Sequence, residues 1–192
     1  MYYMAPKPWT TISTREVYKN KWMRLREDIA GLPNGNTTIY GVCEFGQCVG
    51  VLPFVDAEHV LMVRQYRYVF GENHRWEMPT GGWKAGESLE EAAQRELIEE
   101  VGYRAGRLQH INTNWTSKSV CQELAHLYIG HDLTAVNPAE IIPDETEFLE
   151  VGILPFQDVL QMVLESEIRD SMTVIAVLHT AATNQMGRGF AG

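Results

Sequence analysis

Residues 81–103 read GGWKAGESLEEAAQRELIEEVGY and carry both ends of a predicted helix. At the start, Ser88 and Glu91 have the spacing of a capping box, in which each side chain accepts a hydrogen bond from the other residue's backbone N–H. At the end, Gly102 suits the left-handed conformation in which many helices stop. The segment therefore predicts a helix over residues 88–101.

Three carboxylates share one side of this helix. Glu96, Glu99 and Glu100 fall within an arc of roughly 100°, because each residue turns an α-helix by about 100°. Ala92 and Ala93 come one turn earlier and leave open space beside the acids. Like charges at this spacing repel, and a bound divalent cation such as Mg²⁺, which prefers oxygen ligands, removes the repulsion. Considered alone, the same pattern is also that of a solvated acidic helix face.

The composition is that of an ordinary globular protein. The chain has 192 residues, of which 45% are hydrophobic and 21% are charged, so it can form one domain with a buried core. The net charge of −9 opposes nonspecific binding to nucleic acid or to an anionic membrane, which requires a basic surface. A small phosphate-bearing substrate remains compatible with it, because divalent cations can reverse the sign of a local site.

The apolar runs and the cysteines indicate the cellular compartment that we expect for the protein. No apolar run approaches the ~20 residues that span a bilayer, and the first residues lack the layout of a signal peptide. We therefore expect a cytoplasmic protein without a membrane partner. Cys43, Cys48 and Cys121 contain no Cys-x-x-Cys pair and are expected to be structural thiols. A disulfide between Cys43 and Cys48 has no support in a cytosolic chain.

Short strands and a few helices are expected over the rest of the chain. Residues 10–29 alternate loosely between apolar and polar types and precede an Asn-Gly turn at residues 32–36. Residues 48–55 and 59–68 are expected to form a hairpin. Other strands are predicted at residues 37–43, 104–111, 123–133 and 148–153, with helices near residues 156–165 and 172–183. This mixture indicates an α/β or α+β sandwich, in which helices cover a mixed sheet.

The spacing around the acidic helix is far more specific than the acids themselves. Gly81 is followed after five residues by Glu87, and after seven more by the run Arg95-Glu-Leu-Ile-Glu-Glu-Val-Gly-Tyr103. This arrangement matches the Nudix box, G-x5-E-x7-R-E-U-x-E-E-x-G-U, where U is a bulky apolar residue. Every charged and glycine position is filled, and only Tyr103 in the last position departs mildly. The chain thus resembles the Nudix hydrolases.

The resemblance implies a site for several Mg²⁺ or Mn²⁺ ions that bridge a diphosphate. The principal ligands would be Glu96, Glu100 and the carbonyl oxygen of Thr80, with Glu99 as an auxiliary ligand or a neighbouring acid. Clustered metal ions neutralise the charge of a diphosphate, help to deprotonate a water and stabilise the leaving phosphate. In the same family Glu87 and Arg95 correspond to a pair that holds the loop against the helix.

The segments before the box point to one branch of the family. Residues 63–67 read VRQYR and residues 76–81 read WEMPTG, which is similar to ADP-ribose and nucleotide-sugar pyrophosphatases. The resemblance implies that Arg67 contacts a phosphate and that Glu77 lies at the metal site. For Arg64, a phosphate contact and an exposed strand residue are both open.

An acidic segment downstream resembles the loop that supplies the catalytic base in this branch. Residues 143–148 read PDETEF, and Glu145 and Glu147 are the two candidates. In one assignment Glu145 is the base and Glu147 assists a metal, and the reverse is also open. Glu99 is the next candidate, while an acidic surface turn without a catalytic role is the alternative.

One departure concerns the sugar of the substrate. ADP-ribose enzymes usually carry a Ser-Pro-Gly-like turn after the box, whereas residues 112–120 here read NTNWTSKSV, without proline. Glu123 still matches an acid that contacts the distal sugar. The resemblance therefore implies a nucleoside-diphosphate sugar as substrate and leaves ADP-ribose and others, such as a GDP-sugar, open.

The N-terminal residues resemble a segment that exchanges with a partner subunit and helps to enclose the nucleotide base. The resemblance thus implies a homodimer, with Arg26 among the substrate contacts. We expect residues 1–45 to form this unit, residues 46–185 to form the hydrolase domain, and residues 186–192 to be a loose tail.

Other functions remain as alternatives. A noncatalytic nucleotide-sensing module on the same scaffold is expected to tolerate loss of box carboxylates, which are all present here. A prenyl-diphosphate isomerase would need a reactive cysteine and a different box. Hydrolysis of other nucleotides, including mutagenic nucleotides and RNA caps, fits the box but is less similar in the segments before it.

Overall fold

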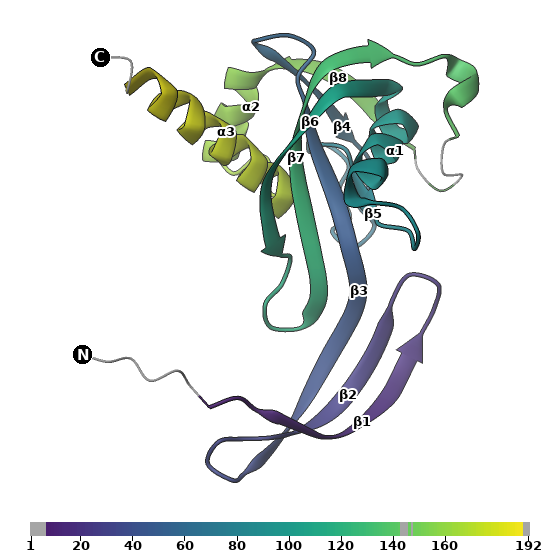
Figure 1. Ribbon diagram of the computed structural model, residues 1–192, viewed down its shortest axis with the longest axis vertical. Coiled ribbons are helices and arrows are strands. Elements are labelled where there is room, and N and C mark those ends of the chain that lie inside the picture. Colours follow the sequence, from purple (N-terminus) through teal and green to yellow (C-terminus); the bar gives the residue numbers. More distant parts are fainter. Residues whose placement is uncertain (1–6, 143–145, 147, 190–192) are drawn as a thin grey trace. The chain divides into compact units, whose positions relative to one another are not determined.

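A computed structural model of the chain describes residues 7–142, residue 146 and residues 148–189 (Figure 1). The chain divides into two compact units. Unit 1 comprises Met1–Gly46 and Trp115–Glu123, and unit 2 comprises Gln47–Asn114 and Leu124–Gly192. Within the described ranges, no helix is both long and apolar enough to cross a membrane.

Unit 1 contains antiparallel strands joined by tight turns. Strand β1 (Thr10–Lys19) pairs with β2 (Arg24–Gly31), which pairs with the first part of β3 (Thr37–Pro53). The turn between β2 and β3 is closed by a hydrogen bond from the Leu32 N–H to the Asn36 carbonyl oxygen at 2.8 Å, and Gly35 has a φ of 87°. The turn predicted from the Asn-Gly pair is confirmed, because this backbone conformation favours glycine.

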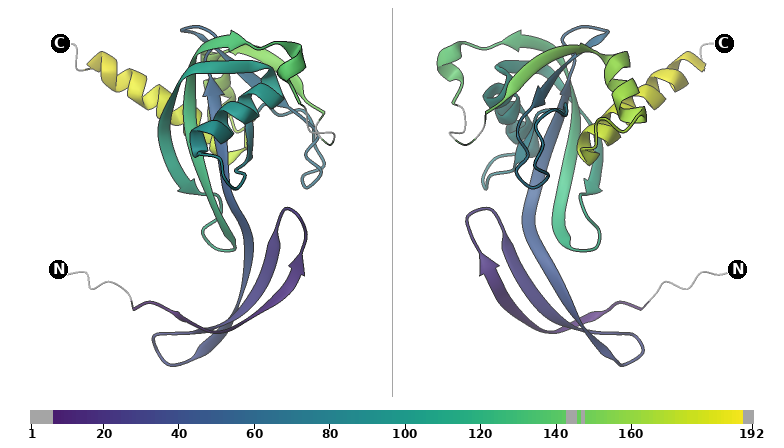
Figure 2. Two further views of the ribbon diagram at one scale, coloured as in Figure 1. Left: turned by 45° about the vertical axis from the view of Figure 1, so that its right-hand side comes forward. Right: turned by 180° about the vertical axis from the view of Figure 1, so that it is seen from behind.

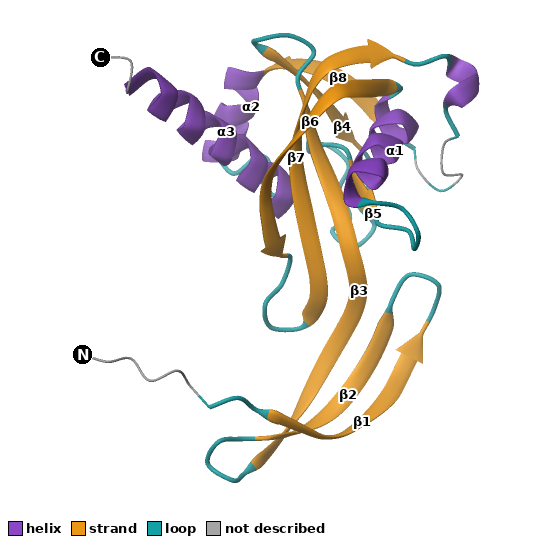
Figure 3. Ribbon diagram, viewed as in Figure 1, coloured by secondary structure: helices purple, strands orange, loops and turns teal. Residues whose placement is uncertain are grey.

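Unit 2 contains the remaining elements apart from the end of β6 and the start of β7, and Figure 3 colours them by type. In chain order they are β4 (His59–Arg64), β5 (Thr80–Gly82), α1 (Leu89–Val101), β6 (Tyr103–Trp115), β7 (Cys121–Ala135), η1 (Pro138–Glu140), β8 (Glu150–Pro155), α2 (Phe156–Leu164) and α3 (Ser171–Gly189). The second part of β3 lies between β5 and β7, β6 pairs with β7, and β4 pairs with β8 in a separate two-stranded sheet.

The alternation of side chains along β3 explains why helices cover both faces in unit 2. Val51 packs in a cluster with Leu97 of α1. Its neighbour Leu52 packs in a second cluster with Val159 of α2 and Val177 of α3. Successive side chains of a strand point to opposite faces, so one strand supplies both clusters. Figure 2 shows α1 on one side of these strands and α2 and α3 on the other.

The helix expected from the box is confirmed at both ends. The Ser88 hydroxyl accepts a hydrogen bond from the Glu91 N–H at 3.1 Å, and the Glu91 carboxylate accepts one from the Ser88 N–H at 2.7 Å. Gly102 has a φ of 73° and donates its N–H to the Ile98 carbonyl oxygen at 3.0 Å. Local capping interactions therefore suffice to set the length of α1.

One expectation about the elements is wrong. The hairpin between residues 48–55 and 59–68 is reduced to a single bridge, Phe54–Val60, and β4 ends at Arg64 and pairs with β8 instead. Apolar alternation indicates a strand but does not specify its partner. The tail expected from residue 186 begins within α3, which extends to Gly189, and its looseness stays a prediction.

Candidate active site

Two buried carboxylates of α1 face β5. The exposed fractions of Glu96 and Glu100 are 8% and 6%. Thr80 directs its N–H toward Oε1 of Glu100 at 3.4 Å. Gly81 brings the backbone against Glu96 so closely that a Cβ atom there would lie 2.0 Å from the Glu96 carboxyl carbon. Only glycine is therefore compatible with this position of the Glu96 carboxylate.

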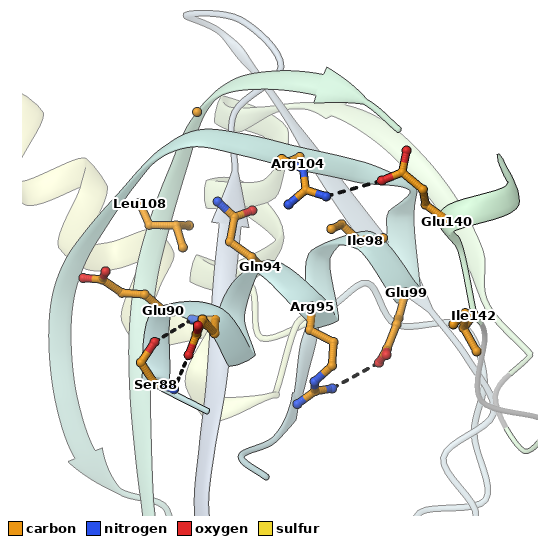
Figure 4. Close-up of a pocket in the computed structure, with 12 residues that line it drawn as sticks. Ser88, Glu90, Gln94, Arg95, Ile98, Glu99, Arg104, Leu108, Glu140 and Ile142 are labelled. Atoms are coloured by element: carbon orange, nitrogen blue, oxygen red, sulfur yellow. Dashed lines mark hydrogen bonds and ion pairs between the residues drawn. The ribbon is translucent and has the colours of Figure 1, made fainter. Parts of the chain in front are cut away.

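Arg95 connects the acids of α1 to the loop before the helix, and Figure 4 shows its ion pair with Glu99. Its Nε and Nη2 bind the two carboxylate oxygens of Glu87 at 3.1 and 2.8 Å, and Nη2 also reaches the Gly82 carbonyl oxygen at 2.8 Å. Its Nη1 contacts Oε1 of Glu96 at 2.5 Å and Oε2 of Glu99 at 3.1 Å. The hydrogen bonds to Glu87 are the largest cause of a raised Arg95 pKa. Arg95 thus stays charged and holds three glutamates.

Glu77 lies on the segment that leads into β5. Its exposed fraction is 8%, and its two oxygens accept hydrogen bonds from Nε and Nη2 of Arg67 at 2.8 and 2.6 Å. Burial raises the pKa of Glu77, and the charge of Arg67 opposes that rise. The backbone of Glu77 exchanges two hydrogen bonds of 2.8 Å with Val63 of β4. Arg67 and Glu77, which are 10 residues apart in the segments before the box, therefore form an ion pair.

Arg64 binds a different carboxylate from the one that Arg67 binds. Its Nε and Nη2 bind both carboxylate oxygens of Glu150 at 2.8 Å, and its guanidinium lies 4.7 Å from the ring centroid of Trp76. Arg64 and Glu150 are also register partners on β4 and β8. These contacts fit a structural role in joining the two strands.

The donors at this site fit divalent cations. Glu96 and Glu100 offer carboxylate oxygens, the ligands that Mg²⁺ and Mn²⁺ prefer. Burial raises the pKa of Glu96, and the hydrogen bond and charge of Arg95 oppose that rise. In the part of the chain that the structure describes, no three His, Cys, Asp or Glu side chains already surround a common point. Ion pairs direct Glu96 and Glu99 toward Arg95, and Glu77 toward Arg67.

Four other predicted site residues belong to unit 1 or are not among the described residues. Glu145 and Glu147 lie outside the described residues. Arg26 and Glu123 belong to unit 1. There, Arg26 pairs with Asp28 and, at 2.8 Å, with Glu44, while Glu123 accepts a hydrogen bond from the Thr116 hydroxyl at 2.6 Å. The roles predicted for these four residues stay predictions.

A cavity of about 750 Å³ runs along α1, and Figure 4 shows ten of its lining side chains by name. Arg95 and Glu99 line this cavity, whereas Glu96 and Glu100 do not. Across it, Arg104 of β6 pairs with Glu140 at 3.4 Å. No local sequence pattern indicates this cavity, because residues 104 and 140 come together only through tertiary structure.

Two residues at the start of α3 were also not predicted to lie near the acids. Thr173 is fully buried, and its hydroxyl accepts a hydrogen bond from the Met78 N–H at 3.0 Å. Asp170 accepts hydrogen bonds from both the N–H and the hydroxyl of Thr173. The spacing of Asp170 and Thr173 is an N-cap pattern. That pattern signals a helix start but not the contact with Met78.

Comparisons with known proteins cover nearly the whole chain. The NUDIX domain model matches residues 44–173, and the model of the nucleoside diphosphate sugar hydrolase N-terminal domain matches residues 9–43. The methanol dehydrogenase activator of Bacillus methanolicus is 33% identical over 87% of this chain and 89% of its own length. The ADP-ribose pyrophosphatase of Bacillus subtilis (strain 168) is 31% identical over the same shares.

The fold is shared with a solved structure. The crystal structure of an ADP compounds hydrolase superposes with a TM-score of 0.83, covering 97% of this chain and 99% of the other, at 21% sequence identity. This likeness confirms the predicted α/β sandwich.

Proposed function

The chain belongs to the Nudix hydrolase family, whose members generally need divalent metal ions, and from this premise we propose that it hydrolyses a nucleoside-diphosphate sugar. Cleavage of the diphosphate with one water releases a nucleoside monophosphate and a sugar phosphate. The observation that carries this proposal is the match to the nucleoside diphosphate sugar hydrolase N-terminal domain directly before a NUDIX domain. The name of the relative from Bacillus subtilis also supports it.

We assign Mg²⁺ or Mn²⁺ to Glu96, Glu100 and the carbonyl oxygen of Thr80, with Glu99 as an auxiliary ligand. Bound ions supply charge neutralisation of the diphosphate and activation of a water. The chain itself contributes a close approach of its backbone to Glu96, since a Cβ atom at Gly81 would collide with that carboxylate. Arg95 keeps the loop at Glu87 fastened to α1.

Arg67 is the proposed phosphate contact and Glu77 the proposed acid beside the metal site. Their ion pair places a cationic and an anionic group side by side. A substrate phosphate can take over hydrogen bonds of the guanidinium, because phosphate and carboxylate oxygens both match its donors. Glu77 would then face the positive charge of the ions.

The water needs a base that is not fully committed to a metal ion, and we propose Glu145, with Glu147 as the reversed assignment. Glu145→Gln is expected to lower kcat by roughly 10²–10⁴-fold, the usual contribution of general-base catalysis. Substrate binding is expected to change little. If Glu145→Gln and Glu147→Gln both keep the wild-type kcat, the base lies elsewhere and Glu99 is tested next.

A homodimer is proposed as the working form, with residues 1–45 contributing to the partner's substrate pocket through groups such as Arg26. Every residue of β1 is exposed, including the apolar Ile12 and Val17 at 60% and 47%. β1 is also an edge strand of its sheet, and the backbone groups of such an edge can pair with a second chain. Light scattering of the full chain and of a variant without the first 45 residues tests this, and a fully active monomer after deletion would overturn it. The cytoplasmic location stays a prediction.

A substrate panel tests the proposed reaction. The purified full chain is incubated with Mg²⁺ or Mn²⁺ and ADP-ribose, GDP-sugars, UDP-sugars, nucleoside triphosphates or capped RNA, and the products are separated by ion-exchange chromatography. We expect a mononucleotide and a sugar phosphate from at least one nucleoside-diphosphate sugar. Glu100→Gln serves as the control for contaminating hydrolases. Turnover of triphosphates or capped RNA alone would contradict the proposed substrate class.

A second candidate is a regulatory role, favoured by the relative named methanol dehydrogenase activator. A noncatalytic sensor would bind a nucleotide without releasing products. Calorimetric binding of ADP-ribose together with no product from any compound of the panel would favour this candidate over hydrolysis.

A further inference from the structure

We propose that the first turn of α3 positions the active-site segment Glu77–Thr80 through the buried hydroxyl of Thr173 and the carboxylate of Asp170. Thr173 and Asp170 are positioning residues, because they act through the backbone of Met78 and touch no reacting atom. The inference rests on the proposed function insofar as this segment carries Glu77 and the Thr80 carbonyl oxygen.

The contact with Thr173 occurs where the segment changes its strand partner. The backbone of Glu77 is bonded to Val63 of β4 at 2.8 Å in both directions. Two residues later, the Pro79 carbonyl oxygen accepts the N–H of Val51 of β3 at 3.0 Å. Between these two ladders, the Met78 N–H donates to the Thr173 hydroxyl at 3.0 Å. The Thr173 hydroxyl thus accepts the Met78 N–H at the residue where the backbone changes its partner strand from β4 to β3.

The position of this hydrogen bond makes it hard to replace. Met78 and Thr173 are both 0% exposed, so the hydrogen bond is shielded from water. A buried backbone N–H without a partner is strongly disfavoured. The next residue, Pro79, has no N–H of its own. Met78 therefore provides the donor by which this part of the segment is tied to α3.

Asp170 sets the direction of the Thr173 hydroxyl. The hydroxyl has one hydrogen, which it donates to Oδ2 of Asp170 at 2.7 Å, so a lone pair is left to accept from Met78. The same Oδ2 accepts the Thr173 N–H at 2.8 Å, and the Asp170 carbonyl oxygen accepts the Val174 N–H at 2.9 Å. The cap of α3 and the active-site segment therefore share one hydrogen-bond network.

The network also reaches the Arg67–Glu77 pair. The charge of Asp170 interacts electrostatically with both Arg67 and Glu77. Glu77 and Thr80 are the two ends of the segment whose middle is held by Thr173. A displacement of Met78 is therefore transmitted to a carboxylate at one end and to a carbonyl oxygen at the other. Misplacement of about 1 Å can lower a rate by roughly 10²-fold.

A second buried threonine of α3 provides a matched control. Thr180 has an exposed fraction of 4%, and its hydroxyl donates to the Ala176 carbonyl oxygen of its own helix at 2.8 Å. Thr173→Val and Thr180→Val each remove one buried hydroxyl from the same helix and keep the shape of the side chain. They differ in that only Thr173 is bonded to the active-site segment.

The test compares Thr173→Val, Thr173→Ser and Thr180→Val as full-length proteins. We expect Thr173→Val to lower kcat by about 10–100-fold, with KM changed by less than about threefold. Mn²⁺ binding without substrate, followed by electron paramagnetic resonance, is expected to weaken. Thr173→Ser retains the hydroxyl and is expected to restore kcat and Mn²⁺ binding to within about threefold. Thr180→Val is expected to match the wild type in both.

Amide hydrogen exchange separates this inference from the proposed function. The Met78 amide is expected to exchange faster in Thr173→Val than in Thr180→Val, whichever substrate the enzyme uses. If no compound of the panel is hydrolysed but exchange and Mn²⁺ binding change as expected, the proposed function fails and the positioning role stands. Equal exchange, Mn²⁺ binding and kcat in the two valine variants would overturn the inference.

Asp170→Asn provides a second route if Thr173→Val does not fold. Asparagine caps helices about as well as aspartate, but it lacks the charge that strengthens the hydrogen bond from Thr173. We expect a smaller decrease of kcat in the same direction and faster exchange of the Met78 amide. Wild-type values of both would overturn the role of Asp170.

Discussion

Arginine–glutamate pairs occur in both units of the molecule, at the same distance but in different surroundings. In unit 1, Arg15 binds Glu27 at 2.8 Å with 67% of the arginine side chain exposed. In unit 2, Arg95 binds Glu87 at 2.8 Å with only 20% of the arginine side chain exposed. Water competes for the first pair but much less for the second. The distance therefore does not distinguish the two pairs, and burial does.

The two regions also differ in how many acids share one cation. The guanidinium of Arg95 contacts Glu87, Glu96 and Glu99 at once. Arg15 has one acidic partner among the described residues, Glu27. Three carboxylates around one arginine leave negative charge that metal ions can balance. A pair of one arginine and one glutamate at the surface is already neutral.

The largest expected effect concerns the buried acids of α1. Glu96→Gln and Glu100→Gln are each expected to lower kcat by at least about 10³-fold, because each removes a charge that holds the ions at the diphosphate. Thermal unfolding without metal is expected to stay near the wild type, since a buried charge is removed along with its repulsion. Glu90→Gln, an exposed change on the same helix, controls for the charge.

Near-normal turnover of Glu96→Gln and Glu100→Gln at saturating Mg²⁺ would contradict the metal-binding role that separates the acids of α1 from those of unit 1. The acids of α1 would then be as dispensable as those at the surface of unit 1.

The next effect concerns glycines of the two units. A Cβ atom at Gly81 would lie 2.0 Å from the Glu96 carboxyl carbon, whereas nothing lies within 4 Å of one at Gly41 in β3. Gly81→Ala is expected to lower kcat by about 10²-fold, because the Glu96 carboxylate must move. Gly41→Ala is expected to leave kcat unchanged. Steady-state kinetics of both variants, with circular dichroism to verify folding, would sharpen or contradict the comparison.

Stability is expected to respond less strongly than activity. Arg95→Met leaves partly buried carboxylates without their cation and is expected to lower the free energy of unfolding by about 1–3 kcal/mol. At concentrations too low for dimerisation, Arg15→Met is expected to produce no measurable loss, because its pair is exposed in the single chain. Urea unfolding of both variants measures the difference. A large loss from Arg15→Met at dimer-forming concentrations would mean that a second copy buries β1.

The smallest expected effect is a pH dependence of the Arg95 contribution. Hydrogen bonds from Arg95 are the largest cause of a lowered Glu87 pKa. A depressed pKa in the folded state contributes stability above the unfolded value, and that contribution is lost as the pH falls through the folded pKa. The stability gap between wild type and Arg95→Met should therefore narrow as the pH falls below the ordinary glutamate value of 4.5. A gap that widens in acid would contradict the assigned pairing.

Much of the fold and part of the site were predictable because they depend on short-range spacing. The capping box at Ser88 and the glycine at position 102 set the ends of α1, and the turn at Gly35 follows from an Asn-Gly pair. The pairing of β4 with β8 was not predictable, since Val60 and Leu154 are apolar strand residues without any mark of their partner. Strand partners depend on the whole sheet.

The Nudix box and the position of the carboxylates on one side of α1 could be predicted from the sequence alone. Helix periodicity places residues three or four apart on the same side, whatever the rest of the chain does. Only the tertiary structure decided how those acids are held. Thr173 is 95 residues from Met78, and Glu150 is 86 residues from Arg64, yet each pair is joined by hydrogen bonds. Contacts over such separations form only when distant strands and helices pack together, and a local sequence pattern carries no record of that packing.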